Sequence, residues 1–499
     1  MNFNIFTARP KESDNKASHK LIAHMVGQLL LFEPLLLLAC CGVSLWYGEE
    51  DWKAFLISLS ACALVSVTLL IYGRNSSDTA SRTEGYIVVA FSWVFYTLFG
   101  MMPYVVGGYI PSVTDAFFET ISGFTTTGAT ILNNIEQMPH GILFWRSLTQ
   151  WIGGLGIVCF TIILLPGFGT SGQMLFSSEA TGVTHDKIHP KTRIMARYIW
   201  TIYCIITALE TVLLIAGGMG VFDALCHAFT TTSTGGFSTK QASVAYWNSP
   251  FMEYVISLFM LFSSVNFSLY FIAVKGHFRQ VWHSVELRWF LASVGVLTII
   301  ITLTLIWQNG YGVEEAFRKA FFQMSSLHTS CGFATDDYNL WPPFTWMLIL
   351  FAMLSGGCTG STSGGIKSLR LAIIAICIKN QFRQILHPHA VLPVRAGKMF
   401  DNKVVTTVLA FFATYFGLIF VGCLLLMLLG VGFTEATGTV VSAMGNTGPG
   451  LGKFGPAYTW ALLPDAGKWI LSVLMIIGRL EIFGFLLIFY PPTWRGSWA

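Results

Sequence analysis

One short pattern occurs four times in this chain, and it limits the possible folds more than any other feature. In each copy an alanine lies 12 residues before a glycine that small and hydroxyl side chains surround. The four pairs are Ala116 and Gly128, Ala224 and Gly236, Ala320 and Gly332, and Ala436 and Gly448. The glycines are 108, 96 and 116 residues apart, so each unit is larger than a solenoid repeat. We therefore expect four copies of one structural unit.

The residues around these copies have the composition of a membrane protein. Of the 499 residues, 54% are hydrophobic and 11% are charged, whereas a soluble domain has about 25% charged residues. The first apolar run, Leu21–Tyr47, is longer than the apolar core of a signal peptide, so we expect a retained span. The apolar runs predict ten spanning helices, at 21–47, 53–73, 85–109, 139–165, 193–218, 248–274, 286–308, 342–380, 403–432 and 466–490.

These spans group into a hairpin followed by four repeats. Each repeat has one span, a short half-span that carries the pattern, and a second span. The fold class is therefore an all-α polytopic membrane protein with four pseudo-symmetric helix–pore-helix–helix repeats around a central pore. The predicted units are a tail at 1–20, the hairpin at 21–73, pore repeats at 85–165, 193–274, 286–380 and 403–490, and a tail at 491–499.

The half-span is the informative part of each repeat. It is too short to cross ~30 Å of hydrocarbon, and it ends in irregular Thr/Gly-rich backbone. Such backbone persists at membrane depth only where protein buries it or water lines it, and four copies around one axis meet that condition. An acidic residue at the start (Asp115, Asp223, Glu435) suits a helix N-terminus, so the negative end of the helix faces the glycine and favours a cation. The third repeat departs from this, with Lys319 in the acidic position.

The positive charges predict the orientation of the chain. Six of the 29 lysines and arginines lie on the side of the half-spans: Lys53, Lys240, Arg318, Lys319, Lys453 and Lys468. Arg146 and Arg479 lie within spans, and the others lie in the tails and in the loops at 74–84, 166–197, 275–288 and 367–403. Positive residues gather on the cytoplasmic side. Both termini are therefore predicted to be cytoplasmic, with the half-spans entering from outside.

The glycine stretches predict a potassium filter. Rings of backbone carbonyls can replace the water around K⁺, and glycine permits the backbone that aims those carbonyls at an axis. Glycine-mediated helix packing is the alternative for one isolated stretch, but four stretches in phase favour a filter. The predicted filter residues are Thr126, Thr127 and Gly128; Thr234, Gly235 and Gly236; Ser330, Cys331 and Gly332; and Asn446, Thr447 and Gly448.

Two further features interrupt the apolar spans. The segment 356–365 contains five glycines, each costing a continuous helix about 1 kcal/mol relative to alanine, so we expect an unwound loop under the filter, with a passive kink as the alternative. These glycines are Gly356, Gly357, Gly360, Gly364 and Gly365. Arg479 lies well within the last span, where a charge is costly and indicates function. It is predicted to place a positive barrier in the pore, although a pair with Glu210 or Glu253 is an alternative.

Several motifs give the chain a family resemblance. The stretches TTTGAT (125–130), TGGFST (234–239), CGFATD (331–336) and NTGPGLG (446–452) are similar to the four filters of the membrane subunit of Trk-type potassium uptake systems, in the Trk/Ktr/HKT superfamily. The segments 151–156, 356–365 and 478–483 also resemble that family. The resemblance runs from about residue 21 to the end. Ser330-Cys331, where the family usually has Thr-Ala, and Ser363 depart from the family pattern.

The resemblance implies further properties. The 356–365 loop and Arg479 would act as a gate, and Gly128 would favour potassium, since a serine there accompanies sodium permeability in the family. The subunit would form a homodimer and bind cytoplasmic Rossmann-type, TrkA-like nucleotide-binding regulatory subunits. The basic loop 367–403 is expected to contact anionic lipid heads, to dock that regulator, or both. The location would be the bacterial cytoplasmic (inner) membrane.

The predicted function is therefore potassium uptake, with K⁺ as the transported ion, no organic cofactor and no nucleic acid. An H⁺- or Na⁺-coupled symporter is the alternative. An enzyme is not expected, because the spans show no converging acid/base or metal-ligand motif, and the chain has no Walker motif and no GxGxxG that follows a strand. The cysteines, His227 and His328 are interpreted as packing residues, Arg146 as a packing or surface residue, and Glu210 as a satisfied interhelical group.

Overall fold

The computed structural model describes residues 18–76, 81–156, 192–390 and 392–491. Most of the two predicted tails and of the predicted 166–197 loop lie outside these ranges. The N-terminal hairpin consists of α1 (His19–Leu30), α2 (Glu33–Tyr47) and α3 (Trp52–Tyr72). It packs against the first repeat, where the Tyr96 hydroxyl donates a hydrogen bond to the Leu29 carbonyl at 2.7 Å.

The four repeats follow one another along the chain. The first contains α4 (Arg82–Gly100), α5 (Met102–Val106), α6 (Val113–Phe124) and α7 (His140–Leu155). The second contains α10 (Thr192–Ala216), α11 (Val221–Thr232), α12 (Pro250–Ser263), α13 (Phe267–Val274) and α14 (Phe278–Trp282). The third contains α15 (Val285–Thr304), a π-helical turn at Leu305–Asn309, α16 (Val313–His328), α17 (Pro343–Leu354) and α18 (Ser368–Leu386). The fourth contains α19 (Asn402–Leu428), α20 (Phe433–Gly445), α21 (Asp465–Arg479) and α22 (Phe483–Leu486).

The predicted half-spans are the short helices α6, α11, α16 and α20. They contain 12, 12, 16 and 13 residues. At 1.5 Å per residue they are roughly 18–24 Å long, which is less than the hydrocarbon thickness. A hydrogen bond from the Asp115 N–H to the Ser112 side chain caps α6, whereas Gly220, Gly312 and Gly432 precede the other three helices. After each filter strand the chain forms a short 3-10 turn, at Ile135–Gln137, Ser243–Trp247, Tyr338–Leu340 and Gly452–Phe454.

Two of the second spans differ from the prediction of continuous helices, and a third is interrupted at its predicted non-helical loop. The predicted span 248–274 bends by 94° between α12 and α13, and the predicted span 466–490 bends by 113° between α21 and α22. The predicted span 342–380 stops at Leu354 and resumes at Ser368. Six described helices are long and apolar enough to cross a membrane, or eight if each bent pair counts as one span. The end of the predicted span 139–165 lies outside the described residues.

The breaks have a tertiary cause. At the α12 break the carbonyls of Ser263 and Ser264 accept hydrogen bonds from the Thr362 hydroxyl at 3.1 Å and from the Cys358 N–H at 2.8 Å. At the α21 break Glu481 and Ile482 have positive φ values of 53° and 66°. Partners distant in the sequence therefore determine where these helices end.

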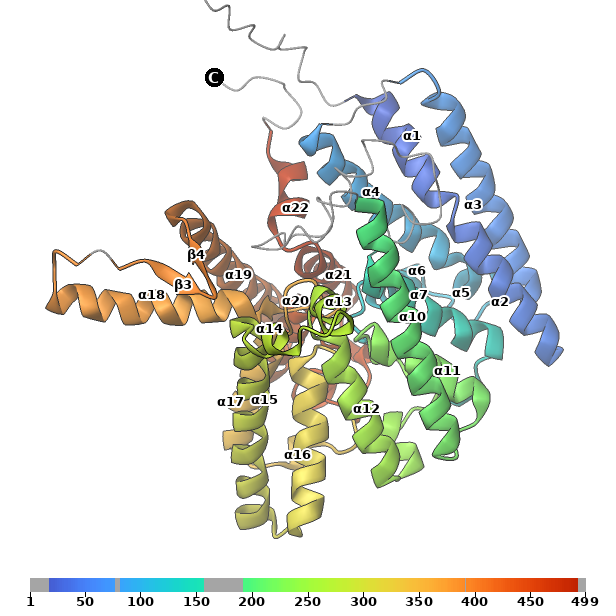
Figure 1. The fold of residues 1–499 in the computed structure, drawn as a ribbon. Coiled ribbons are helices and arrows are strands. Elements are labelled where there is room, and N and C mark those ends of the chain that lie inside the picture. The colour runs from blue at the N-terminus through green and yellow to red at the C-terminus, as the bar shows by residue number, and fades with distance from the viewer. Residues whose placement is uncertain (1–17, 77–80, 157–191, 391, 492–499) are drawn as a thin grey trace, which may run out of the picture.

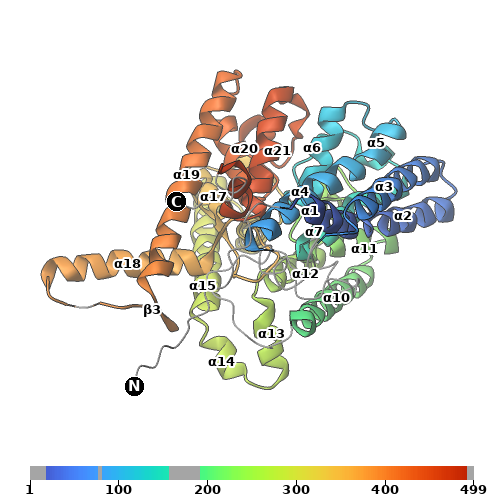
Figure 2. The same cartoon turned by 90° about the horizontal axis from the view of Figure 1, so that it is seen from above.

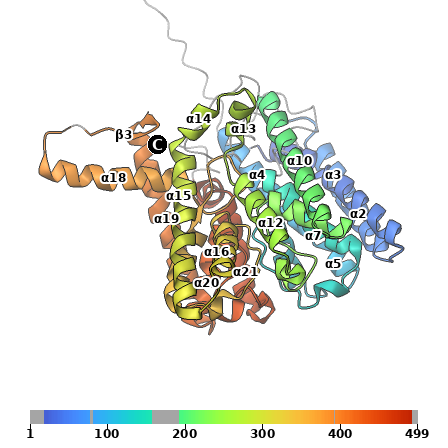
Figure 3. The ribbon, with the colours of Figure 1, turned by 60° about the horizontal axis from the view of Figure 1, so that its bottom comes forward.

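The repeats surround the middle of the molecule. In Figures 1 and 3, α10 and α12 stand between the α15–α16 pair and the N-terminal helices α2 and α3. Helix α18 projects from the body on the side opposite α2 and α3, as Figures 1 and 2 show. An antiparallel hairpin of β3 (Val394–Ala396) and β4 (Lys398–Phe400) leads from this arm to α19, and a two-residue parallel pair, β1 (Ser355–Gly356) and β2 (Ile366–Lys367), closes the base of the 356–365 loop.

Candidate functional site

The four predicted filter strands share one backbone conformation. The filter glycines Gly128, Gly236, Gly332 and Gly448 have φ values of 81°, 74°, 90° and 101°. Two residues earlier, Thr126, Thr234, Ser330 and Asn446 also have positive φ, between 52° and 58°. Positive φ is uncommon for residues with a side chain, and eight of the described non-glycine residues have it. Half of those lie at this one position of the repeat, so the strained turn is part of the repeated design.

Hydrogen bonds fix the direction of the peptide groups in these strands. In the first strand the N–H groups of Thr127 and Gly128 both point to the carbonyl of Ser122, at 2.9 and 3.4 Å. The same pair of bonds joins Gly235 and Gly236 to Thr230, and Cys331 and Gly332 to Ser326; in the fourth strand Thr447 donates to Ser442 at 2.9 Å. In a trans peptide the N–H and C=O point in opposite directions. The carbonyls of the first two residues in the first three strands, and of Asn446 in the fourth, therefore point away from the pore helix.

The four strands form a closed ring. A β-carbon on Gly128 would lie closer than 3.0 Å to the carbonyl oxygen of Gly235, in the second strand. In the same way, a β-carbon on Gly236 would clash with the Cys331 carbonyl oxygen and one on Gly332 with that of Thr447. A β-carbon on Gly448 would lie 2.7 Å from the Thr127 carbonyl oxygen. Each strand therefore touches the next, and the fourth returns to the first. The structure brings all twelve predicted filter residues together around one axis.

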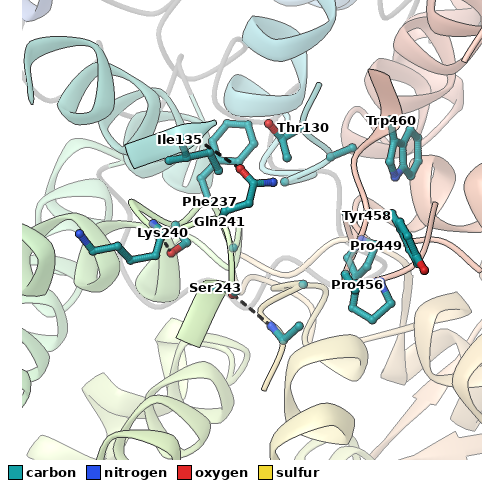
Figure 4. Close-up of a pocket in the computed structure, with 18 of the residues that line it drawn as sticks. Thr130, Ile135, Phe237, Lys240, Gln241, Ser243, Pro449, Pro456, Tyr458 and Trp460 are labelled. Carbon is teal, nitrogen blue, oxygen red and sulfur yellow. Dashed lines mark hydrogen bonds between the residues drawn. The ribbon is translucent and has the colours of Figure 1, made fainter. Parts of the chain in front are cut away.

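A pocket opens at the glycine end of the ring. Its lining includes Gly128, Gly236, Gly332 and Gly448, one from each repeat. Figure 4 shows Phe237 and Gln241 of the second repeat on one side of this pocket, and Tyr458 and Trp460 of the fourth repeat on the other. The pocket therefore leads to the glycine end of the ring from outside it.

The segment 356–365 lies at the opposite end of the ring. It is not helical, and its hydroxyl and N–H groups contact the first residue of two filter strands. The Gly364 N–H donates to the Ser330 hydroxyl at 2.6 Å, and the Thr234 hydroxyl donates to that of Thr362 at 3.4 Å. A β-carbon on Gly364 would also clash with the carbonyl of Gly445, beside the fourth strand. The loop therefore packs under three of the four strands.

The glycines of this segment have different surroundings. Gly360 and Gly365 have positive φ values of 73° and 66°. A β-carbon on Gly356 would clash with the Gly364 carbonyl, and one on Gly357 would lie 2.8 Å from Ser264. These four positions need glycine for backbone geometry or for close approach. With Gly364 above, this holds for all five predicted loop glycines.

Arg479 connects this loop to the first repeat. Its guanidinium donates to the carbonyl of Thr362 at 2.7 Å, and to the carbonyls of Gly153 and Gly154, at the end of α7, at 2.7 and 2.8 Å. Glu253, one of the two carboxylates predicted as alternative partners, pairs with Arg318 instead, and Glu481, two residues after Arg479, pairs with Arg370. The other predicted alternative, Glu210, is fully buried in α10.

Charged residues hold the loop from the other side. The carboxylate of Glu286, in the first turn of α15, accepts hydrogen bonds from the N–H and the hydroxyl of Thr359, at 2.5 and 2.6 Å. The buried Lys367 ammonium donates to the carbonyl of Ser363. The loop is thus fixed at its tip, at its base and against the filter.

Lys319, the exception among the pore-helix starts, is part of a reversed ion pair. Its ammonium lies 3.3 Å from Asp336, four residues after the filter glycine. In the second repeat the equivalent positions are Asp223 and Lys240, 3.7 Å apart. The two repeats therefore connect the start of the pore helix to the strand beyond the filter with the same pair in opposite order.

Arg146, predicted to be either a packing or a surface residue, is buried. It is 1% exposed and pairs with the buried Glu119 at 2.9 Å, behind the first filter strand. His227 and His328 are fully buried, and their rings lie within hydrogen-bonding distance of Ser238 and Ser293, at 2.9 Å each, which agrees with a packing role. Among the described residues no cluster of metal-ligating side chains occurs.

The sequence analysis missed Glu119 and Gln150. Glu119 occupies the position in α6 that His227 occupies in α11, nine residues before the filter glycine, and alignment of the repeats would have shown this polar position. Gln150 is fully buried in α7 and reaches the second filter strand. Nothing in its local sequence indicates that contact.

Comparisons with known proteins agree with this geometry. Residues 52–493 match the TrkH family, which is described as cation transport proteins. The chain is 34% identical over 484 residues to the Trk system potassium uptake protein TrkH of Halomonas elongata, covering 96% of this chain and 100% of the relative. It is 33% identical over 489 residues to the Trk system potassium uptake protein TrkG of Escherichia coli, covering 96% and 100%.

A solved structure shows the same fold. The crystal structure of the potassium transporter TrkH from Vibrio parahaemolyticus matches with a TM-score of 0.86 and 32% identity, over 95% of this chain and 99% of that one. The predicted fold class, a polytopic helical protein with four pore repeats, is confirmed.

Proposed function

The chain belongs to the TrkH family of cation transport proteins, and from this premise we propose that it takes up potassium ions across the cytoplasmic membrane. It is a multi-pass membrane transport protein and not an enzyme. The observation that carries the proposal is the closed ring of four strands. In this ring each filter glycine lies against the carbonyl of the residue that precedes the filter glycine of the next strand.

The proposed filter consists of the twelve predicted strand residues. Their N–H groups bond to the pore helices, which leaves the carbonyls directed toward the ring. Four such strands present rings of oxygen that can replace the hydration shell of K⁺. The pore helices direct their C-terminal, partially negative ends at the same place, which stabilises a cation there. K⁺ is thus the transported ion, and this chain uses no organic cofactor.

The 356–365 loop and Arg479 form the proposed gate. An ion that leaves the filter at its Thr234 and Ser330 end meets the loop next, and the Arg479 charge lies beside Thr362 in that loop. Both features oppose the flow of a cation. For the gate to open, the contacts of Thr362 and Gly364 with the filter strands must break.

Conduction through this pore is favoured here over coupled symport. Glu210, the carboxylate that a proton-coupled route would use, packs beside Thr231 and Thr232 at the end of α11, behind the second strand. A symporter would carry protons with K⁺, so uptake into vesicles would dissipate an imposed pH gradient. We expect the gradient to persist during uptake.

The relatives are named as proteins of Trk systems, which suggests that this chain also works with partner subunits. We propose a homodimer that binds cytoplasmic Rossmann-type nucleotide-binding subunits. The projecting arm of α18 and its hairpin carries the exposed basic residues Lys379, Arg383 and Arg395, which suit an acidic partner or anionic lipid heads. The positive-inside pattern supports a cytoplasmic location for this arm and for both termini.

The test of the function is uptake of ⁸⁶Rb⁺ into liposomes that contain the full chain. We expect uptake that external K⁺ inhibits and that an equal concentration of Na⁺ leaves nearly unchanged. Empty liposomes give the background. Equal inhibition by the two ions would contradict a potassium filter, and uptake at the background level would contradict a conducting pore.

A further inference from the structure

The second filter strand lacks a side chain that the other three have. The residue before the filter glycine is Thr127, Cys331 or Thr447 in three strands, but it is Gly235 in the second strand. The Gly235–Gly236 peptide therefore has no β-carbon on either side, and glycine has the most conformational freedom of all residues. A carbonyl that must hold an ion needs some other restraint at this place.

Gln150 of the first repeat occupies the space of the missing side chain. A β-carbon on Gly235 would lie closer than 3.0 Å to the Cδ, Oε1 and Nε2 atoms of Gln150. Gln150 is fully buried, in the middle of α7. Its amide group thus stands where the other strands place a threonine or cysteine side chain.

The amide of Gln150 holds the second strand at two points. Its Nε2 donates to the carbonyl of Gly235 at 2.8 Å, and its Oε1 accepts from the N–H of Phe237 at 3.0 Å. These two groups flank Gly236, so the side chain spans the filter glycine. Within the described residues, Gly235 O is the one carbonyl of the twelve predicted filter residues for which a side-chain donor is found.

One helical turn earlier, Arg146 holds the continuation of the same strand. It donates to the carbonyl of Ser238 at 3.0 Å, and its guanidinium lies 4.1 Å from the centre of the Phe237 ring. Residues four apart lie on one face of a helix, so Arg146 and Gln150 form a single contact surface. The Glu119 carboxylate, 2.9 Å from Arg146, fixes this surface to the first pore helix.

We propose that Gln150 is a positioning residue that replaces the missing side chain of the second filter strand and thereby sets the ion selectivity of the ring. The proposal rests on the potassium filter proposed above. The amide supplies the restraint that a β-carbon supplies in the other strands, since it donates to one backbone atom and accepts from another. Gln150→Glu keeps the size but removes the donor, so it leaves the Gly235 carbonyl facing a carboxylate oxygen.

The experiment compares Gln150→Ala, Gly235→Ala and the double variant in liposomes that contain the full chain. The readout is the concentration of Na⁺ relative to K⁺ that halves ⁸⁶Rb⁺ uptake. Gly235 does not have a positive φ, and the atoms nearest to a β-carbon added there all belong to Gln150. We expect each single variant to reduce the selectivity ratio about tenfold, the size expected for a lost buried hydrogen bond.

The double variant distinguishes this proposal from a general packing role. It restores a side chain before Gly236 and removes the clash, so we expect it to recover most of the selectivity that either single variant loses. Gln323→Ala, a fully buried glutamine behind the third strand, is the matched control and should leave the ratio unchanged. A double variant as poor as the worse single variant would overturn the proposal, as would normal selectivity in Gln150→Ala.

A second readout separates this proposal from the filter itself. Thermal unfolding of the same proteins in detergent measures the coupling between positions 150 and 235 without transport. If the wild-type chain shows no preference for K⁺, the filter proposal fails whatever the coupling is. If the wild-type chain is selective but the two substitutions act additively in both assays, the proposed role of Gln150 is wrong, whereas the filter proposal is not affected. If Gln150→Ala does not fold, Gln150→Glu supplies the loss of donor, and normal selectivity in that variant overturns the proposal.

Discussion

A β-carbon on Gly128 would lie closer than 3.0 Å to the carbonyl oxygen of Gly235, so the first and second repeats meet backbone to backbone. The same relationship recurs three more times and returns to the first strand. Four segments that lie 96 to 116 residues apart in sequence thus form one ring.

Gly128→Ser is expected to admit sodium. The serine would have to adopt a φ of 81°, and its β-carbon would displace the Gly235 carbonyl. We expect Na⁺ to inhibit ⁸⁶Rb⁺ uptake about fivefold more strongly, since loss of one oxygen contact costs on the order of 1 kcal/mol. Gly108→Ser is the control, because Gly108 has a φ of 73° with open space around it. Unchanged selectivity in Gly128→Ser would argue against this filter.

Arg479→Ala is expected to increase the rate of ⁸⁶Rb⁺ uptake. The substitution removes both the positive charge and the hydrogen bonds to Thr362 and Gly153. Arg479→Lys keeps the charge and should give an intermediate rate. Arg197→Ala, which removes an exposed arginine of α10, is the control. A wild-type rate in Arg479→Ala would mean that this side chain does not limit the flux.

Deletion of residues 359–362 is also expected to increase the rate. It removes the Thr359 hydroxyl that Glu286 holds and the Thr362 hydroxyl that reaches the carbonyl of Thr232. A deletion of equal length at 387–390, in the exposed connection after α18, controls for shortening of the chain. If the loop is only a kink, the two deletions will leave the same initial rate of uptake.

The reversed ion pair predicts the effect of a charge change at Lys319. Lys319→Asp places a third negative charge beside Asp336 and Glu315, and we expect it to lower the free energy of unfolding by roughly 1 kcal/mol. Combination with Asp336→Lys reproduces the order of Asp223 and Lys240 and should restore the melting temperature. Thermal unfolding in detergent measures both variants. A double variant that melts below the single variant would show that the pair does not stabilise this repeat.

Asp51 predicts a pH dependence of stability. Burial, together with the neighbouring Glu49 carboxylate, raises the pKa of Asp51, which lies in the turn between α2 and α3 and is 2% exposed. The folded chain therefore binds this proton more tightly than the unfolded chain does. The resulting stabilisation is complete below the ordinary aspartate pKa of about 4 and is lost as the pH rises through the raised pKa.

The comparison with Asp51→Asn isolates this contribution. As the pH falls from 7 toward 5, the melting temperature of the wild-type chain should rise relative to that of the asparagine variant. The variant removes the Asp51 carboxyl and leaves the rest of the chain unchanged. A difference that does not change with pH would show that Asp51 has an ordinary pKa.

The sequence predicted the features that depend on local pattern. The four half-spans, the glycine after each and the non-helical 356–365 segment all follow from repeat spacing, apolar length and glycine content. These signals are local, since a short apolar helix and a run of glycines have the same consequences in any surroundings. The departure at Lys319 was also visible, although its partner Asp336 was not identified.

The remaining features depend on contacts between distant segments. The apolar runs through Ser263 and Arg479 give no sign of a bend, because the groups that receive the broken helix ends come from elsewhere in the chain. Gln150 is one of several polar residues in α7, and its role is visible only when Gly235 of the next repeat lies against it. Glu119 and Arg146 are 27 residues apart, so neither alone predicts a buried pair.

The central claim is that the ring of four strands holds a dehydrated potassium ion. The most direct test is a crystal structure of the full chain grown with Rb⁺ in place of K⁺, with anomalous scattering used to locate the ion. We predict an anomalous peak on the axis between Gly128, Gly236, Gly332 and Gly448, surrounded by carbonyl oxygens of all four strands. A ring without such a peak, in crystals that show Rb⁺ elsewhere, would contradict the account.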